Sequence, residues 1–354
     1  MKSAKLHRLK LIAGCFLLIL STVFSLVGCQ FSSFLSPNDD TTNADGNNPS
    51  GETPPEEPPK PLFYNRYTGL ACDETISSCR PVSVCIGNFD GKVQKGLSAA
   101  DILIEAPVAR DETRLWVITT DWAKLTEIKN ITSAESYMFP SVKPFDAVCV
   151  FNGAKELPSS VAALNYASGS LGAYFSSADG SVASSGDLLR SAAVEKQFSL
   201  KDSMSALPYR LCEVDTSFTP KGNPISSIHF SYSSKNTVDF SYDAASGTYL
   251  RSQTGIPHKD ALNDTQLSFT NVILLFHNVS YYHSASGTSF TIDTGSGGSG
   301  FAYTGGGVIN VNWSYDENGS LVFKDDTGEI LTLNRGKTYI AIMKITDSTT
   351  IVAR

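Results

Sequence analysis

The chain of 354 residues carries 28 Lys and Arg and 35 Asp and Glu, which gives a formal net charge of −7 at pH 7. Four of the cations and none of the acids fall within residues 1–28, so the remaining chain sets 24 basic residues against 35 acidic ones, a net charge of −11. Because nucleic acids and anionic membrane surfaces are both bound through clustered Lys and Arg, this balance argues against nucleic acid as a partner and against a basic membrane-binding patch.

Residues 1–28 have the form of a lipoprotein signal peptide. A basic start is followed by an apolar run from Leu11 to Val27, which ends in Leu26-Val27-Gly28-Cys29. This ending fits the bacterial lipobox, at which the cysteine thiol receives a diacylglycerol and becomes the new N-terminus. We expect Cys29 to anchor the protein on the extracytoplasmic face of the cell membrane, since two or three acyl chains attach stably. The alternative is an uncleaved single-span anchor, although about 17 apolar residues is at the short limit for crossing a bilayer.

Residues 29–61 are expected to form a disordered stalk. The segment is poor in apolar residues and contains Pro54-Pro55-Glu56-Glu57-Pro58-Pro59, so it cannot bury enough apolar surface to fold and its proline-rich half should be extended. Six of its residues are acidic and one is basic, which assigns −5 of the charge to the stalk and leaves −6 on the folded part.

The patterns in the rest of the chain predict an α+β protein with a mixed α/β domain over residues 62–215. Short apolar runs indicate strands, and the polar Arg110-Asp111-Glu112 predicts a hairpin turn between two of them. Helical spacing or capping indicates three helices. The strands are expected at Pro81–Ile86, Ile102–Val108, Thr113–Thr120 and Ala147–Phe151, and the helices at Ser98–Asp101, Ser160–Tyr166 and Ser185–Val194.

From residue 216 to residue 354 the pattern predicts a β-rich domain that is sandwich- or barrel-like. Short strands recur every 8–12 residues, as is typical of such folds. Turn sequences such as Asp316-Glu317-Asn318-Gly319 separate them. The strands are expected at residues 228–233, 238–242, 271–276, 290–293, 308–315, 320–324, 330–333 and 338–345.

Five cysteines remain after Cys15 is removed with the signal peptide and Cys29 is acylated. Cys72 and Cys79 lie seven apart in a polar stretch, where a small-loop disulfide is plausible outside the cell. Cys85 and Cys149 lie in apolar runs, so buried thiols are the default expectation. Cys212 is unassigned.

Two short segments carry the strongest candidates for a binding site. Glu105 lies in an apolar run, where a carboxylate is costly to bury unless it is paired, and Arg114 on the opposing strand is the expected partner. Pro257 fixes the backbone before His258, so that Arg251, His258 and Asp260 gather near one turn. Each set could equally be a structural ion pair or a loop-stabilising network.

Other motifs are weaker. His258, His277 and His283 with Asp260 could make a metal site, but a structural role for the last two histidines is the default, and no metal or other cofactor is expected. Gly295, Gly297 and Gly300 match G-x-G-x-x-G, yet strand-like sequence lies on both sides, so a mobile hairpin loop is the better interpretation than a dinucleotide site. No nucleophile motif of a known hydrolase type is present.

The order and spacing of several short motifs resemble the YerB family of bacterial lipoproteins over about residues 64–345. The motifs include Tyr67-Thr68-Gly69-Leu70, Gly96–Ile102, Thr113-Arg114, Pro257-His258 with Asp260, and Asn271-Val272-Ile273. The resemblance implies a two-part architecture and an envelope location, without an established reaction, and it adds Asn271 to the candidate ligand-binding residues Glu105, Arg114, Arg251, His258 and Asp260.

The chain departs from the family pattern where the family tends to carry Pro-Val-Arg-Ser-Ala-Arg. Here the segment reads Asn130 to Glu135, so Thr132 and Glu135 replace both arginines. Because arginine forks are hard to replace in carboxylate or phosphate binding, an anion bound through those positions in the family should be bound poorly by this chain.

Two hypotheses follow for function. The first is a membrane-anchored lipoprotein of the cell envelope that binds a small ligand or an envelope protein, or acts as a scaffold, without catalysis. The second is an envelope hydrolase or transferase acting on a wall polymer, with Glu105 or Asp260 as general acid or base beside His258. A pair of exposed carboxylates that face one groove would favour the second hypothesis over the first.

Overall fold

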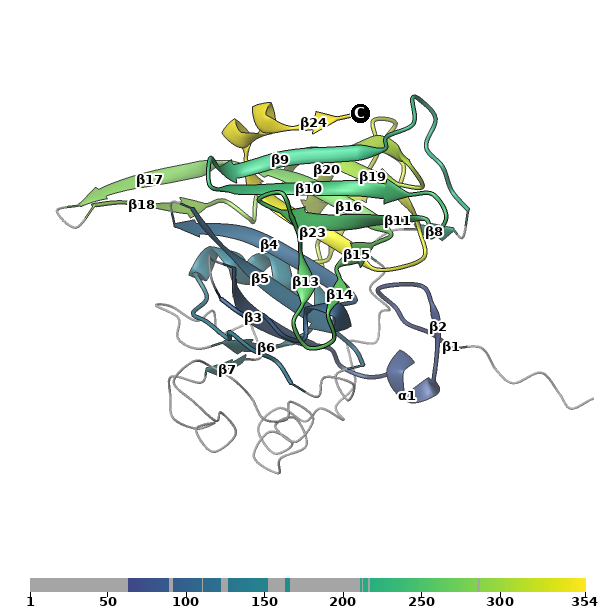
Figure 1. The fold of residues 1–354 in the computed structure, drawn as a ribbon, viewed down its shortest axis with the longest axis horizontal. Helices are drawn as coiled ribbons and strands as arrows, with labels where there is room; N and C mark the ends of the chain where they lie inside the picture. Colours follow the sequence, from purple (N-terminus) through teal and green to yellow (C-terminus); the bar gives the residue numbers. More distant parts are fainter. Residues whose placement is uncertain are drawn as a thin grey trace, which may run out of the picture. The chain divides into compact units, whose positions relative to one another are not determined.

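The structure is a computed structural model that describes residues 63–88, 92–109, 111–121, 127–151, 163–165, 211, 213–215, 217–284 and 287–354. The chain divides into two units, Met1–Pro59 and Lys60–Arg354, and the second, called the body below, holds every described residue (Figure 1). The body is mostly β with little helix, mixed in its N-terminal part and β-rich in its C-terminal part, which confirms the expected class at this level. The predicted signal peptide and stalk, the predicted helix at residues 185–194 and Cys212 lie outside the described residues.

A ten-stranded sheet, called the large sheet below, forms the centre of the body. Its middle strands β16, β23 and β3 have almost no exposed residue, as expected for strands with both faces covered. The order across the sheet is β21 (Leu321–Lys324), β20 (Gly307–Tyr315), β19 (Gly298–Thr304), β16 (Asn271–His277), β23 (Thr338–Lys344), β4 (Ile102–Ala109), β5 (Glu112–Thr119), β3 (Val82–Asn88), β6 (Val148–Phe151) and β7 (Ala163–Asn165).

A six-stranded sheet, the small sheet, packs on one face of the large sheet. In β9 and β10 buried and part-exposed residues alternate, because one face meets the core and the other meets solvent. Its order is β12 (Ile256–Pro257), β11 (Thr248–Gln253), β10 (Asn236–Asp243), β9 (Ser227–Ser233) and β24 (Val352–Ala353), with β15 (Ser268–Phe269) also paired to β11.

Strands from both predicted domains share the large sheet. Strand β23, from near the end of the chain, pairs in parallel with β4, with Thr338 opposite Ile102 and Ala341 opposite Glu105. The two packed sheets are sandwich-like as expected, but the sandwich is not confined to residues 216–354, because its central sheet also takes β3 to β7. The domain boundary after residue 215 stays a prediction.

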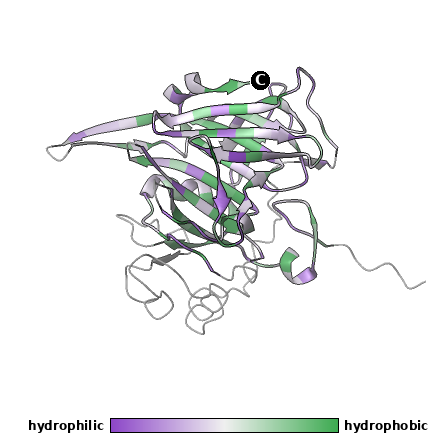
Figure 2. Ribbon diagram, in the orientation of Figure 1, coloured by the Kyte–Doolittle hydropathy of each residue, from purple (hydrophilic) through white to green (hydrophobic). Residues whose placement is uncertain are grey.

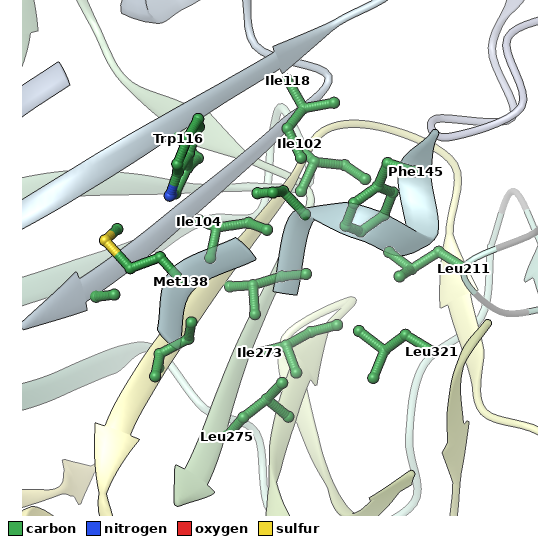
Figure 3. Packing of buried hydrophobic residues seen from close by; sticks show 14 of the residues in the cluster. Ile102, Ile104, Trp116, Ile118, Met138, Phe145, Leu211, Ile273, Leu275 and Leu321 are labelled. Atoms are coloured by element: carbon green, nitrogen blue, oxygen red, sulfur yellow. The ribbon is translucent and has the colours of Figure 1, made fainter. Parts of the chain in front are cut away.

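Two apolar clusters cover the two faces of the large sheet. Alternation along β4 and β5 sends Leu103 and Val117 to the cluster between the sheets, and Ile104 and Trp116 to the cluster on the opposite face. The second cluster lies under the short helices η3 (Ser136–Met138), α2 (Phe139–Val142) and η4 (Lys143–Phe145). Figure 2 shows apolar residues along the strands of both sheets, and Figure 3 shows part of the second cluster, including Met138 against Ile104.

Most predicted strands are confirmed, but two helical expectations are corrected. The expected helix at Ser160–Tyr166 contains β7, which pairs in parallel with β6, so pairing at the sheet edge overrides a weak local helix preference. The expected helix at Ser98–Asp101 is the single 3₁₀ turn η1 (Leu97–Ala99), preceded by Gly96 in a left-handed conformation. Among the described residues no helix is long and apolar enough to cross a bilayer.

Smaller elements complete the body. The two-stranded sheets are β1 (Phe63–Tyr64) with β2 (Ala71–Cys72), β13 (Lys259–Asp260) with β14 (Thr265–Gln266), β17 (Val279–Ser284) with β18 (Gly287–Ile292), and β8 (Glu213–Asp215) with β22 (Thr332–Asn334). The remaining helices are α1 (Glu74–Ser77) and η7 (Ile345–Thr350).

Two of the three glycines of the G-x-G-x-x-G match, Gly297 and Gly300, are required by close packing. Gly300 lies within β19, where a Cβ atom would stand 2.1 Å from the carbonyl oxygen of Leu274 on β16. Gly297 has a left-handed φ of +82° and leads the chain into that strand. The expectation of a mobile hairpin loop is therefore wrong at Gly300, because strand pairing requires a residue without a side chain there.

His277, at the end of β16, is a structural residue. It is 3% exposed, its Nδ1 lies 2.9 Å from the carbonyl oxygen of Leu275, and its ring lies 4.5 Å from that of Trp313. Burial lowers the pKa of His277 to about 4. The folded protein therefore keeps this imidazole neutral at pH values where an unfolded chain would protonate it.

We predict that His277 makes the body less stable on mild acidification. The unfolded imidazole takes up its proton near pH 6.5 and the folded one only near 4, so its contribution to the free energy of unfolding is present above pH 6.5 and is lost as the pH falls toward 4. The loss should be on the order of 3 kcal/mol. Urea denaturation of the His277→Gln variant should show a weaker pH dependence in this window than the wild type.

The matched control is His283→Gln, on the exposed part of β17. It should keep the wild-type dependence on pH. Equal slopes for His277→Gln and wild type between pH 6.5 and 4 would contradict the assignment.

Candidate functional site

Glu105, in the middle of β4, is fully buried and has both carboxylate oxygens occupied. Its Oε1 accepts hydrogen bonds from Asn88 Nδ2 at 2.9 Å and from Thr113 Oγ1 at 2.6 Å. Its Oε2 accepts from Arg251 Nη2 at 2.7 Å and from the Tyr339 hydroxyl at 2.6 Å. The four donors come from β3, β5, β11 and β23, so one carboxylate joins three strands of the large sheet to the small sheet.

The charge of Glu105 is balanced by Arg251, and both side chains are 0% exposed. Burial by itself lowers the pKa of Arg251, but the negative charge of Glu105 and the hydrogen bond to it outweigh this, so the pKa is raised. Burial and the neighbouring Glu105 carboxylate raise the pKa of Tyr339 well above its ordinary value, so this hydroxyl stays a donor. The guanidinium also lies over the Tyr339 ring, 5.7 Å from its centroid.

Five side chains form a closed hydrogen-bonded circuit, called the polar ring below: Glu105, Arg251, His258, Gln94 and Asn88. Arg251 Nη1 contacts His258 Nδ1, His258 Nε2 lies 2.6 Å from Gln94 Oε1, Gln94 Nε2 donates to Asn88 Oδ1 at 3.1 Å, and Asn88 donates to Glu105. Because arginine can only donate, His258 Nδ1 must accept and its Nε2 must carry the proton. Four of the five hydrogen bonds therefore run in one direction, from Arg251 through His258, Gln94 and Asn88 to Glu105, and the fifth runs directly from Arg251 to Glu105.

The turn from β11 to β12 brings His258 back over Arg251. Thr254 and Gly255 both have left-handed φ angles, of 51° and 74°, which reverse the chain tightly. Pro257 then pairs with Ser252, and the backbone amide of His258 donates to the carbonyl of Arg251 at 3.0 Å. The expected gathering of Arg251 and His258 is thus present.

A groove of about 930 Å³ opens beside the polar ring. Its size is within the range of ordinary ligand pockets. Three ring members, Asn88, Gln94 and His258, line it together with the tips of three hairpins; the remaining lining residues are Lys92, Asp111, Glu112, Ser234, Lys235, Asn236, Gln253, Thr254, Ile256 and Pro257.

Arg114 is not the partner of Glu105, so that expectation is wrong. In the β4–β5 pairing Glu105 is opposite Leu115, and Arg114 is opposite Ala106. Neighbouring residues of a strand point to opposite faces, so Arg114 lies on the helix-covered face, where it contacts the carbonyl oxygen of Ser133 at 3.3 Å and Glu112 at 3.4 Å. The real partner, Arg251, comes from the other sheet.

Thr132 and Glu135, at the positions of the family arginines, flank the Ser133 contact of Arg114. The amide of Thr132 donates to Cys85 at 3.0 Å, and Glu135 immediately precedes η3. Neither residue lines the groove. The two positions at which the sequence was expected to depart from the family pattern therefore lie outside the groove beside the polar ring.

Asp260 is fully buried but acts outside the polar ring. Its oxygens accept from the backbone amides of Gly96, Ser98 and Leu262 at 2.8–2.9 Å and from the Ser98 hydroxyl at 2.6 Å. The next residue, Ala261, donates to the carbonyl of Gln94 at 2.9 Å. Asp260 thus holds the segment that carries Gln94 and is a positioning residue.

Asn271 belongs to a separate buried network. Its Nδ2 donates to the carbonyl of Asn334 at 2.9 Å, and its Oδ1 accepts from Thr304 at 2.7 Å. The first bond reaches β22 of a two-stranded sheet, and the second joins β16 to its neighbour β19 in the large sheet. They do not include a residue of the groove.

The remaining candidates are dispersed. His277 is buried, His283 is exposed on β17, and His258 belongs to the polar ring, so the three histidines are not gathered; no group of three metal-ligating side chains occurs among the described residues. Cys85 and Cys149 are buried as expected, and burial raises the pKa of the Cys85 thiol to about 12.

No disulfide joins Cys72 and Cys79 among the described residues, contrary to expectation. The helical turn α1 separates the two cysteines along the chain. The Cys79 thiol instead contacts the carbonyl oxygen of Arg80 at 3.4 Å.

Sequence reasoning missed four residues of the site: Asn88, Thr113 and Tyr339, which donate to the central carboxylate, and Gln94, which belongs to the polar ring. Tyr339 lies in an apolar strand, where an aromatic residue is expected for packing alone. Gln94 lies in a polar connection without any motif. Thr113 was marked only as part of a family motif, and a buried acid in a strand is the one general signal that polar partners must exist nearby.

Comparisons with known proteins agree on one family. The N-terminal model of the family described as "Protein of unknown function (DUF3048)" matches residues 67–198, and its C-terminal model matches residues 228–340. A protein of Bacillus subtilis (strain 168) named "Putative lipoprotein YerB" is 29% identical over 299 residues, which cover 80% of this chain and 87% of that protein. The crystal structure of YerB from Bacillus subtilis has a TM-score of 0.67 at 24% identity and covers 82% of this chain and 99% of that one, a likeness in fold.

We predict strong energetic coupling between Glu105 and Arg251. Glu105→Gln and Arg251→Met should each lower the free energy of unfolding by about 3–5 kcal/mol, because each leaves the other side chain buried without its partner. The double variant should lose clearly less than the sum, as measured by urea denaturation in a double-mutant cycle.

The exposed pair Lys259–Asp264, with an N–O distance of 2.9 Å, provides the matched control. The cycle with Lys259→Met and Asp264→Asn should give a much smaller coupling, since water screens this pair. Additive losses at Glu105 and Arg251 would show that the buried pair does not act as a unit.

Proposed function

The chain belongs to the DUF3048 family of YerB-type proteins, and from this premise we propose that it is a membrane-anchored lipoprotein of the cell envelope whose body binds a ligand in the groove beside the polar ring. One observation carries the proposal: three side chains that line the groove are locked by a circuit whose only charges are buried and mutually balanced. Such preorganisation lowers the entropy that a ligand must overcome on binding.

The geometry supports binding better than it supports hydrolysis through the predicted acids. Glu105 has four hydrogen-bond donors on its two oxygens, and Asp260 has its oxygens on backbone amides. Both are buried, and both nitrogens of His258 are engaged. A general acid or base must reach the proton that it transfers, and these carboxylates are already fully occupied.

The carboxylates that do line the groove, Asp111 and Glu112, have cationic neighbours. Asp111 lies 3.5 Å from Lys235 and Glu112 lies 3.4 Å from Arg114. Both side chains are more than two-fifths exposed, as the hydrolase hypothesis requires, but each is engaged by a neighbouring cation at the rim of the groove.

The N-terminal segment supports the anchoring part of the proposal. A basic start, an apolar run and the sequence Leu26-Val27-Gly28-Cys29 precede an acidic, proline-rich stalk. Lipid on Cys29 would hold the protein at the membrane, and the self-repelling stalk would keep the groove away from the anionic bilayer.

We predict that filling the groove abolishes retention of the native ligand. Ser234 is exposed on the β9–β10 turn and lines the groove, so Ser234→Trp places a bulky ring in it without touching the core. The full-length protein and this variant should be purified from native membranes, and the retained molecules identified by mass spectrometry. A compound present with wild type and absent with Ser234→Trp is expected.

Asn312→Trp, on an exposed position of β20 outside the groove, is the control and should retain the compound. Identical sets of retained compounds in all three proteins would contradict binding in the groove. Release of cleaved wall fragments by the wild type, lost in Ser234→Trp, would favour the hydrolase alternative instead.

We predict that Cys29 carries the lipid. Wild-type protein expressed with a labelled fatty acid should incorporate the label and lack residues 1–28, and Cys29→Ser should incorporate none and keep its full length, as read by gel and mass spectrometry. Cys15→Ser, within the apolar run, should behave as wild type. An unlabelled wild-type protein of full length would instead support the single-span anchor.

A further inference from the structure

The hydrogen bonds within the polar ring decide which donors and acceptors of its side chains remain available to a ligand in the groove. Both N–H groups of Asn88 are used, on Glu105 and Thr113, and both N–H groups of Gln94 are used, on Gly87 and Asn88. Among the described residues each carboxamide oxygen accepts from a single donor, and a carboxamide oxygen has two lone pairs. These two side chains can therefore still accept hydrogen bonds but can no longer donate them.

Two further amides extend this surface. Gln253 accepts from Arg251 Nη1 at 3.1 Å and donates to Asn236 Oδ1 at 3.3 Å, and Asn236 donates to the carbonyl of Asp111 at 3.2 Å. Each of the two has one lone pair and one N–H group left. Among the four lining amides, the oxygens with unused lone pairs outnumber the unused N–H groups two to one, so this part of the lining favours a ligand that brings more donors than acceptors.

The charges around the groove select against an ion. Arg251 is neutralised by Glu105, and on the rim Asp111 pairs with Lys235 and Glu112 with Arg114, so these charges are balanced in pairs. An anion would meet the acceptor oxygens, and a cation would find no uncompensated carboxylate. An uncharged ligand with many hydroxyl groups fits best, since each hydroxyl donates one hydrogen bond and can still accept.

The apolar wall of the groove fits the same chemistry. Ile256 is 69% exposed and lies beside Pro257 at the groove. Sugar rings carry C–H faces that pack on such residues, while their hydroxyl edges meet amides. A peptide matches less well, because each of its units brings one donor and one acceptor.

We infer that the groove binds an uncharged, polyhydroxylated chain, that is, a neutral oligosaccharide segment. The inference rests on the proposed function, because it specifies the ligand of the same groove. Two sources share this chemistry, glycans built from N-acetylated amino sugars and neutral hexose polymers, and separate probes can distinguish them.

The experiment titrates the full-length protein, solubilised in a detergent without a sugar headgroup, by isothermal calorimetry. The probes are the tetramer of N-acetylglucosamine, a glucose tetramer, an acidic uronate-containing tetrasaccharide and tetra-alanine. At least one neutral tetrasaccharide should bind, and the acidic one and the peptide should not. Gln253→Leu, which removes one unused oxygen and one N–H group, should weaken binding about tenfold, and Ser234→Trp should abolish it.

Asn312→Leu is the matched amide-to-leucine control and should bind as wild type. Thermal unfolding of each variant should be measured to check that it is folded. If Gln253→Leu does not fold, Ser234→Trp still tests the inference. Groove-dependent binding of the peptide or the acidic probe without the neutral ones would overturn the inference and leave the proposed function intact. Binding of a neutral tetrasaccharide that neither groove variant changes would overturn both.

Discussion

The ion pair between Glu105 and Arg251 sets the register between the two sheets. Each residue lies on a different sheet, both are inaccessible to water, and they meet at 2.7 Å. Taking two charges out of water is expensive, so such a pair needs further hydrogen bonds to most of its remaining lone pairs and protons. Asn88, Thr113 and Tyr339 also donate to the carboxylate, and His258 and Gln253 contact the guanidinium, whose Nε has no hydrogen-bond partner among the described residues. The interior of the body is therefore specified by polar matching as well as by apolar packing.

The same interaction connects the core to the surface. Arg251 uses one nitrogen on Glu105 and the other on His258, and the circuit returns through Gln94 and Asn88. Three side chains that line the groove, those of Asn88, Gln94 and His258, are thus oriented by hydrogen bonds that lead to the buried ion pair. This coupling gives a physical reason for keeping a costly pair in the core: it fixes the hydrogen-bonding polarity of the groove.

Sequence reasoning identified several residues of the site correctly but did not predict correctly which of them contact one another. A buried acid in an apolar strand correctly indicated that Glu105 needs a partner, and the Pro257-His258 turn correctly indicated a gathering with Arg251. The chosen partner, Arg114, was wrong because a one-residue offset in a hairpin turns a side chain to the opposite face. Asp260 was recognised as important for a site, yet its carboxylate holds the backbone of the Gln94 segment.

By itself, the sequence determined many of the strands and turns, the family, and the acidic, proline-rich character of residues 29–61, because each depends on local composition, periodicity or motif order. Only the tertiary structure decided that β23 joins β4 in one sheet, that Arg251 rather than Arg114 neutralises Glu105, and that Gln94 and Tyr339 belong to the site. These contacts join residues up to 236 positions apart, as in the pairing of Thr338 with Ile102. They depend on strand order and on which face each side chain takes, and neither is encoded in the residues near any one of them.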